Sequence, residues 1–200
     1  MVVIRVVNRI FSSNTYLLHE EGSLDYWLVD IGDVDPVLAL LSDKANAQVR
    51  GVFLTHSHFD HIYGINDLCS RYPECVVYAS DFGKEALYDA KKNLSRYHEQ
   101  PIVFKGENVV VVGEGDAIPL FAGERISVIA TPGHCPSSLT FYTNDYVFTG
   151  DAYIPGVEVV TKLPRADRQQ ATQSVARILQ IVQGKDVCPG HGGIMHGGMF

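Results

Sequence analysis

The chain has 200 residues, of which 46% are hydrophobic and 20% are charged, a composition typical of soluble globular proteins. Its formal net charge of −7 argues against a nucleic-acid backbone or an anionic membrane surface as the main partner, because both attract clustered Lys and Arg. No apolar run approaches the roughly 20 residues that a membrane span needs, and arginines interrupt the apolar N-terminus, which favours a strand over a secretory signal.

Apolar runs rich in Val, Ile, Tyr and Phe predict strands along the whole chain. In chain order these runs cover residues 2–7, 14–20, 25–31, 49–55, 75–79, 108–112, 125–131, 138–143, 145–150 and 186–190. Apolar residues at helical spacing predict helices over 36–45, 65–72, 82–99 and 166–183. Asp167 is placed to cap the last helix at its start, and Gly184 follows its end. No linker or repeat divides the chain, so we expect one domain over residues 1–200, with helices covering the outer faces of two sheets.

Five histidines and two aspartates come directly after predicted strands. They are His56, His58, Asp60 and His61 after the strand at 49–55, and then His134, Asp151 and His191 after three later strands. Because α/β proteins gather active-site loops at the carboxyl ends of their strands, we expect these side chains to converge. Imidazole and carboxylate groups are metal ligands, so the sequence predicts a metal site large enough for more than one ion.

The spacing inside HSHFDH at 56–61 indicates how two ions would be divided. Side chains two residues apart point the same way in an extended segment, so His56 and His58 can bind one ion together. The chain then turns, and Asp60 and His61 face another direction that suits a neighbouring ion. Taken singly, Asp60 also suits a helix cap, and the later histidines suit loop positions, but their joint occurrence favours metal binding.

The motif HxHxDH followed by single His, Asp and His residues resembles the signature of the metallo-β-lactamase superfamily, and the resemblance spans essentially the whole chain. It implies an α/β fold of the αββα sandwich type, with two mixed β-sheets flanked by helices. It implies three ligands for a first metal ion, three for a second and one that bridges the two: His56, His58 and His134; Asp60, His61 and His191; and Asp151. We interpret the glycine before His134, Asp151 and His191 as the means by which the backbone turns tightly around clustered ions.

Ligands without thiolate suit two divalent ions, with Zn as the first expectation for a hydrolase and Fe or Mn as alternatives. We expect a hydroxide held by the metals to attack a carbonyl carbon, with Asp60 as the catalytic residue that orients it. The sequence therefore predicts a binuclear metal-dependent hydrolase of a small thioester or related ester, similar to hydroxyacylglutathione hydrolase (glyoxalase II). Its partner is expected to be a small-molecule substrate, with a homodimer left open.

Recognition of that substrate is predicted from the same resemblance. Proteins that resemble glyoxalase II use a basic residue between the bridging Asp and the last helix to bind a substrate carboxylate, so Lys162 and then Arg165 are the candidates. Tyr153 is a third candidate, at the mouth of the site. The alternative is that these charges are only solvated and that Tyr153 packs. The chain ends nine residues after His191 and lacks a Tyr shortly after it, so we expect a single-domain glyoxalase II-like protein.

Two alternative functions stay open on the same scaffold. One is an iron-dependent oxidoreductase similar to persulfide dioxygenases, and the other is a lactonase or β-lactam hydrolase. The four cysteines form no CxxC pair, which is typical of reduced thiols in a cytoplasmic protein. Cys135, next to His134, is expected to be a neutral packing residue.

Overall fold

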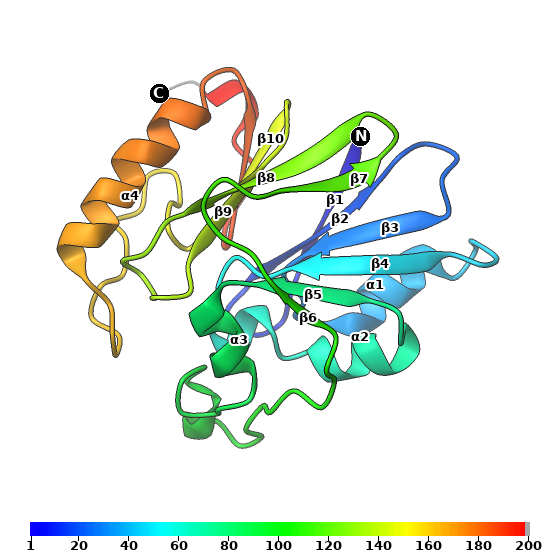
Figure 1. The fold of residues 1–200 in the computed structure, drawn as a ribbon, viewed down its shortest axis with the longest axis horizontal. Coiled ribbons are helices and arrows are strands. Elements are labelled where there is room, and N and C mark those ends of the chain that lie inside the picture. Colours follow the sequence, from blue (N-terminus) through cyan, green and yellow to red (C-terminus); the bar gives the residue numbers. More distant parts are fainter. Residues whose placement is uncertain (199–200) are drawn as a thin grey trace.

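Two β-sheets lie face to face in the computed structural model, which describes residues 1–198 (Figure 1). Side chains from both sheets form a shared core, which includes Trp27 and Phe53 from the first sheet and Phe141 and Phe148 from the second. Separate apolar clusters join the outer face of each sheet to its helices. The predicted αββα sandwich is therefore confirmed.

The first sheet has the strand order β1-β2-β3-β4-β5-β6. Its strands are β1 (Val2–Val7), β2 (Asn14–His19), β3 (Asp25–Val29), β4 (Gln48–Phe53), β5 (Val76–Ala79) and β6 (Val109–Val111). The first three pair antiparallel, and β3 to β6 pair parallel. The helices that follow these strands are α1 (Val34–Leu41), α2 (Ile65–Arg71) and α3 (Asp81–Leu87). Parallel pairing matters here because it brings the carboxyl ends of β3, β4 and β5 to one edge.

The second sheet has the order β11-β10-β9-β8-β7 and is covered by α4 (Arg168–Ile181). Its strands are β7 (Ala117–Phe121), β8 (Glu124–Ala130), β9 (Leu139–Tyr142), β10 (Tyr146–Gly150) and β11 (Asp186–Pro189). The strand β9 runs antiparallel to both β8 and β10, and β11 runs parallel to β10. The strands β8, β10 and β11 consequently end at the same edge, where the predicted ligands follow them.

The long helix predicted over 82–99 is wrong, because α3 ends at Leu87. Two side chains beyond this point bind the backbone in competition with a helix. Asp89 accepts from the backbone N–H groups of the residues two and three positions on, and the Asn93 amide donates to the carbonyls of Ala86 and Ile102. Leu94 then adopts a left-handed φ of 66°. The segment between α3 and β6 is thus a compact loop with a short 3₁₀ turn at Ser95–Tyr97.

The start of α4 agrees with its predicted cap. The Asp167 carboxylate accepts from the backbone N–H of Gln170 at 2.9 Å, and Gly184 has a φ of 72° just beyond the helix. Two further 3₁₀ turns cover Phe59–His61 and His196–Gly198. Among the residues described, no helix combines the length and apolarity that crossing a bilayer would demand.

Candidate metal centre

Two groups of three predicted ligands lie at the shared edge of the sheets, and a third set of potential ligands, Asp30, His56 and His61, overlaps both. Within each group, one ligand atom per residue lies within 4.8 Å of the others; the groups are His56, His58 and His134, and Asp60, His61 and His191. The aspartate and all of the histidines except His191 are buried, and His191 is half-buried. Side chains far apart in the chain are thus brought together as the sequence predicts, although metal binding by them stays a prediction.

Asp151 lies between the two groups. Its Oδ2 atom is 3.6 Å from His134 Nε2 and 3.4 Å from His191 Nε2, and its Oδ1 atom is 3.5 Å from His61 Nε2. One carboxylate therefore contacts a member of the first group and two members of the second. This position suits a ligand shared by two ions.

Backbone carbonyls orient two of the imidazoles. His134 Nδ1 lies 2.9 Å from the Val160 carbonyl, and His191 Nδ1 lies 3.0 Å from the Phe11 carbonyl. A carbonyl only accepts, so Nδ1 carries the proton in each ring. When the ring is neutral, its Nε2 atom is then the acceptor, and this atom points to its group. This is how proteins fix the tautomer of a metal-binding histidine.

A buried aspartate orients two more imidazoles, and sequence reasoning missed it. Asp30 Oδ2 is 2.9 Å from His61 Nδ1 and accepts from the Thr55 hydroxyl at 2.7 Å, and Oδ1 accepts from the Thr55 N–H. Since the single Thr55 hydroxyl proton is directed to Asp30, the hydroxyl accepts from His56 Nδ1, 3.1 Å away. One carboxylate thereby sets the tautomer of a histidine in each group. Asp30 was missed because it lies inside the strand predicted over 25–31, whereas the observed strand β3 ends at Val29 and leaves Asp30 at its carboxyl end.

Two buried polar atoms have no hydrogen-bond partner among the described residues at this centre: His56 Nε2 and Asp151 Oδ1. Buried polar atoms are nearly always paired, so an unpaired one needs an explanation. Here lone pairs of imidazole nitrogens and carboxylate oxygens converge, and cations would satisfy them. The donor set of five imidazoles and two carboxylates therefore fits a pair of metal ions, and because it lacks thiolate it suits Zn, Fe or Mn alike.

Burial keeps the imidazoles of the first group neutral. Desolvation, together with the neighbouring His134 ring, lowers the pKa of His58 to about 3. Burial likewise lowers the pKa of His56 and of His134. Neutral imidazole is the form that binds a metal ion, so the first group needs no deprotonation near pH 7.

The second group is ion-paired when it holds no metal ion. Burial opposes charge on both imidazoles, but the carboxylates of Asp60 and Asp151 outweigh it and raise the pKa of His61 to about 9 and that of His191 to about 10. Conversely, the His61 charge overcomes the effect of burial and lowers the pKa of both carboxyls. The two groups thus differ in protonation although they share one bridging carboxylate.

This difference predicts proton release when the second group binds a metal ion. At pH 7 the carboxylates of Asp60 and Asp151 favour protonated imidazole in this group, but the Nε2 atoms of His61 and His191 lie 3.3 Å apart and cannot both direct a proton at each other. A divalent ion should therefore displace at least one proton. Affinity should fall as the pH falls, and release should cease above about pH 10, where these rings are already neutral. Calorimetric titration in buffers with different ionisation enthalpies measures this release. Identical heats in all buffers at pH 7 would contradict it.

Glycine precedes three of the candidates for two different reasons. Gly133 and Gly150 adopt positive φ values of 137° and 50°, as tight turns require. Gly190 does not have a positive φ, and glycine is required there because no side chain would fit. A Cβ atom there would lie 2.1 Å from Asp151 Oδ1 and 3.0 Å from His61 Cε1, so any side chain would displace both.

The predicted substrate-binding residues lie on the segment between β10 and α4, outside the two groups. Tyr153 packs in the cluster under α4 and lines a cavity of about 280 Å³ there. Lys162 lines another small cavity, beside Glu158, and the Arg165 guanidinium lies 5.7 Å from the centre of the Phe82 ring. The segment reaches the first group through the carbonyl that holds His134. Contact of these three with a substrate stays a prediction.

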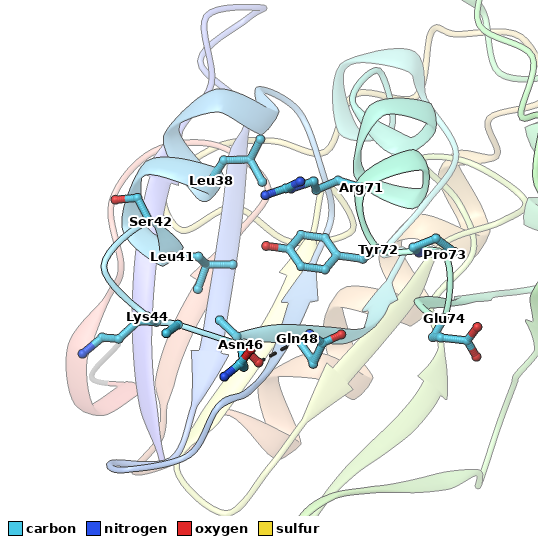
Figure 2. A pocket seen from close by; sticks show the side chains of 12 residues that line it. Leu38, Leu41, Ser42, Lys44, Asn46, Gln48, Arg71, Tyr72, Pro73 and Glu74 are labelled. Carbon is cyan, nitrogen blue, oxygen red and sulfur yellow. Dashed lines mark hydrogen bonds between the residues drawn. The ribbon is translucent and has the colours of Figure 1, made fainter.

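A separate cavity of about 710 Å³ lies between the C-terminal ends of α1 and α2 (Figure 2). Leu41 on α1 and Tyr72, directly after α2, point into it, and Gln48 at the start of β4 lies at its base. The candidate ligands follow the opposite, carboxyl end of β4. This cavity therefore does not belong to the candidate metal centre.

Cys135 agrees with its predicted packing role. It is buried, its Sγ lies 3.0 Å from Ser137 Oγ, and burial raises the pKa of the thiol. A thiol that resists ionisation is a poor nucleophile. Chemistry at this edge therefore depends on the imidazoles and carboxylates.

Comparison with known proteins gives one family and many similar structures. The family model described as the metallo-beta-lactamase superfamily matches residues 8–191. The solved structure of the BLEG-1 B3 metallo-beta-lactamase is 23% identical, with a TM-score of 0.86 over 97% of this chain and 93% of that chain; at this identity the likeness concerns the fold alone. The structure of TTHA1623 in a di-iron-bound form is 28% identical, with a TM-score of 0.81 over 98% and 96% of the two chains. ETHE1 from Myxococcus xanthus is 25% identical, with a TM-score of 0.76 over 98% and 79%.

Proposed function

The chain belongs to the metallo-β-lactamase superfamily, whose model matches most of its length, and we propose that it is a binuclear metal-dependent hydrolase of a small thioester or related ester. The observation that carries this proposal is the placement of the Asp151 carboxylate between two groups of three ligands. A single-ion site needs only one such group. The second group and the shared carboxylate are what support two ions.

Each residue has a distinct task in this proposal. His56, His58 and His134 would hold one ion, Asp60, His61 and His191 would hold the other, and Asp151 is the residue that both ions would share. When bound, such ions polarise a carbonyl group and lower the pKa of water from 15.7 towards about 7. Asp30 keeps the rings of His56 and His61 in the tautomers that this binding requires.

Asp60 is the proposed catalytic residue. Its Oδ2 atom lies 3.4 Å from both His61 Nε2 and His191 Nε2, and the lowered pKa keeps it ionised at neutral pH. An ionised carboxylate at this point can accept a hydrogen bond from the attacking water and orient it toward a substrate carbonyl.

The metal is proposed to be Zn, with Fe or Mn as alternatives, because nitrogen and oxygen ligands serve all three. A solved structure 28% identical to this chain holds two irons, which keeps iron in view for this centre. The test is a panel of thioesters, esters, lactones, β-lactams and phosphodiesters, assayed on protein whose metal content is measured in the same sample. Hydrolysis of thioesters or esters with about two ions per chain supports the proposal. One iron per chain with oxygen consumption would replace it by an oxidoreductase.

Lys162 provides a separate prediction about substrate charge. If its amine binds a substrate carboxylate, Lys162→Ala should raise KM about tenfold for carboxylated substrates and leave uncharged ones unaffected, because one charge-assisted contact is lost. Steady-state kinetics on matched charged and uncharged esters measures the difference. Arg125→Ala, on the distant β7–β8 hairpin, is the control for a lost surface cation. Equal KM values in the Lys162 variant and the unchanged protein would remove this residue from the substrate site.

A further inference from the structure

A cavity of about 800 Å³ lies beside the second group of ligands. Its wall includes Phe11, Phe59 and His98, which come from the β1–β2 hairpin, the His/Asp motif and the segment after α3. Phe59 directly precedes Asp60 in the chain, and the carbonyl of Phe11 holds the His191 ring. The cavity is therefore bordered by residues one step from the proposed reacting centre.

The three rings pack on one another in an ordered way. The centroids of Phe11 and Phe59 are 5.5 Å apart with the rings at 85°, and His98 stacks on Phe59 at 3.5 Å. Phe59 is buried, His98 is exposed, and 66% of the Phe11 surface is exposed. Edge-to-face and stacked contacts hold aromatic rings in defined positions. The Phe11 ring is thus exposed to solvent and is held in position by its contact with the buried Phe59 ring.

The backbone fixes this ring relative to the ligands. Phe11 and Ser12 both adopt a φ of 54°, which residues other than glycine seldom do. Two contacts hold the turn in this conformation: the Ser13 hydroxyl donates to the Asp60 carbonyl at 2.7 Å, and the Phe11 carbonyl lies 3.0 Å from His191 Nδ1. Backbone in sparsely populated regions occurs preferentially at ligand-binding sites. The same turn therefore holds a ligand ring and displays an aromatic side chain.

The charges around the cavity oppose an anionic occupant. Asp35, Asp67 and Glu99 lie on its lining, whereas the Arg9 guanidinium is already bound by Asp33 at 3.1 Å. Lys105 is the other cation among the described lining residues. A carboxylate placed here would meet like charge, while an uncharged ring would meet the exposed face of Phe11.

We propose that this cavity is the subsite for an uncharged aromatic group of the substrate ester, and that the Phe11 side chain determines the preference. The inference rests on the proposed hydrolase function and narrows its substrate class. The proposal assigns different parts of the substrate to the two sides of the metal centre. The uncharged ring would lie beside the second group of ligands, whereas Lys162 lies on the segment that borders the first group.

The test compares phenyl thioacetate and S-methyl thiobenzoate with their para-carboxylated counterparts, so that the ring lies on either side of the cleaved bond. We expect a KM about tenfold lower for at least one uncharged ester than for its carboxylated form. Phe11→Ala should raise the KM of that uncharged ester about tenfold and so narrow the difference, because the aromatic contact is lost. The metal content should stay the same, because the contact to His191 uses the backbone carbonyl. Tyr97→Ala is the matched control, since Tyr97 is 69% exposed and does not line the cavity.

A binding measurement separates failure of the subsite from failure of the hydrolase proposal. Calorimetric titration of the metal-loaded protein with unreactive benzyl methyl ether and its para-carboxylate should show tighter binding of the uncharged ether, and Phe11→Ala should weaken it about tenfold. This result without any ester hydrolysis would retain the subsite and reject the hydrolase. Equal binding of the two ethers, or equal effects of Phe11→Ala and Tyr97→Ala, would overturn the subsite even if esters are cleaved.

Discussion

Replacing His58 by alanine should reduce the metal content and lower kcat/KM for the best ester by more than about 100-fold. Mutation of a residue that only hydrogen-bonds to a metal ligand already costs about 10- to 100-fold in metal affinity or activity, and loss of a ligand should cost more. His58 Nδ1 lies 3.0 Å from His134 Nε2, inside the first group, and alanine has no side-chain nitrogen that could bind a metal ion there. Elemental analysis of protein dialysed against a fixed concentration of free metal, followed by kinetics, measures both effects.

The control for His58→Ala is His19→Ala. His19 lies on the first sheet away from the centre and contacts the Glu20 carbonyl and the Tyr26 ring. It should leave metal content and turnover unchanged. Full turnover with wild-type metal content in His58→Ala would show that His58 is not a ligand.

The variant Asp30→Asn should weaken metal binding in both groups, although Asp30 belongs to neither of the proposed ligand sets. Asp30 accepts three hydrogen bonds, two from Thr55 and one from His61 Nδ1, and only 2% of its surface is exposed. An amide NH₂ in place of Oδ2 would face the Thr55 hydroxyl and His61 Nδ1. It would favour the tautomers with the proton on Nε2, which cannot bind a metal ion. We expect a loss of affinity of about 10- to 100-fold for each ion.

Two substitutions of Thr55 distinguish the direct contact of Asp30 with His61 from its indirect contact with His56 through the Thr55 hydroxyl. Thr55→Val removes the hydrogen bonds of the hydroxyl to Asp30 and His56 but keeps the contact between Asp30 and His61, so it should weaken the first ion more than the second. Thr55→Ser keeps the hydroxyl and should retain both. Competition titrations with a chromophoric chelator give the two affinities. Unchanged affinities in Asp30→Asn would show that this buried carboxylate does not orient the ligands.

The two layered sheets and the convergence of seven side chains were predicted from the strand pattern, and the αββα type of sandwich from the resemblance to a known family. Apolar strands are recognisable from composition, and polar residues directly after parallel strands meet at one edge. The helix predicted over 82–99 was wrong because its Glu, Ala and Lys content favours a helix, whereas Asp89 and Asn93 bind the backbone in another conformation. The strand β7 was missed because Pro119 interrupts its apolar run, and the structure places it at a sheet edge, where proline is tolerated.

Features that depend on three-dimensional packing were beyond sequence reasoning. Asp30 lies inside the strand predicted over 25–31 and has no place in the HxHxDH motif, so its role appears only when its distances to Thr55 and His61 are known. The aromatic contact between Phe11, Phe59 and His98 joins three distant segments, and no periodicity relates them. His98 fits no ligand position in the sequence, and the structure gives it a stacking partner instead.

Each group of ligands takes members from both sheets. His56, His58, Asp60 and His61 follow β4 of the first sheet, while His134, Asp151 and His191 follow strands of the second. A bound cation would therefore cross-link the N-terminal and C-terminal halves of the polypeptide at their common margin, in addition to the apolar layer between them. At a free concentration 100 times Kd, each ion would add about 2.7 kcal/mol to the free energy of unfolding. Separation of the two halves would then require release of the ions. Thermal stability and catalytic activity would therefore both rise with the concentration of free metal ions.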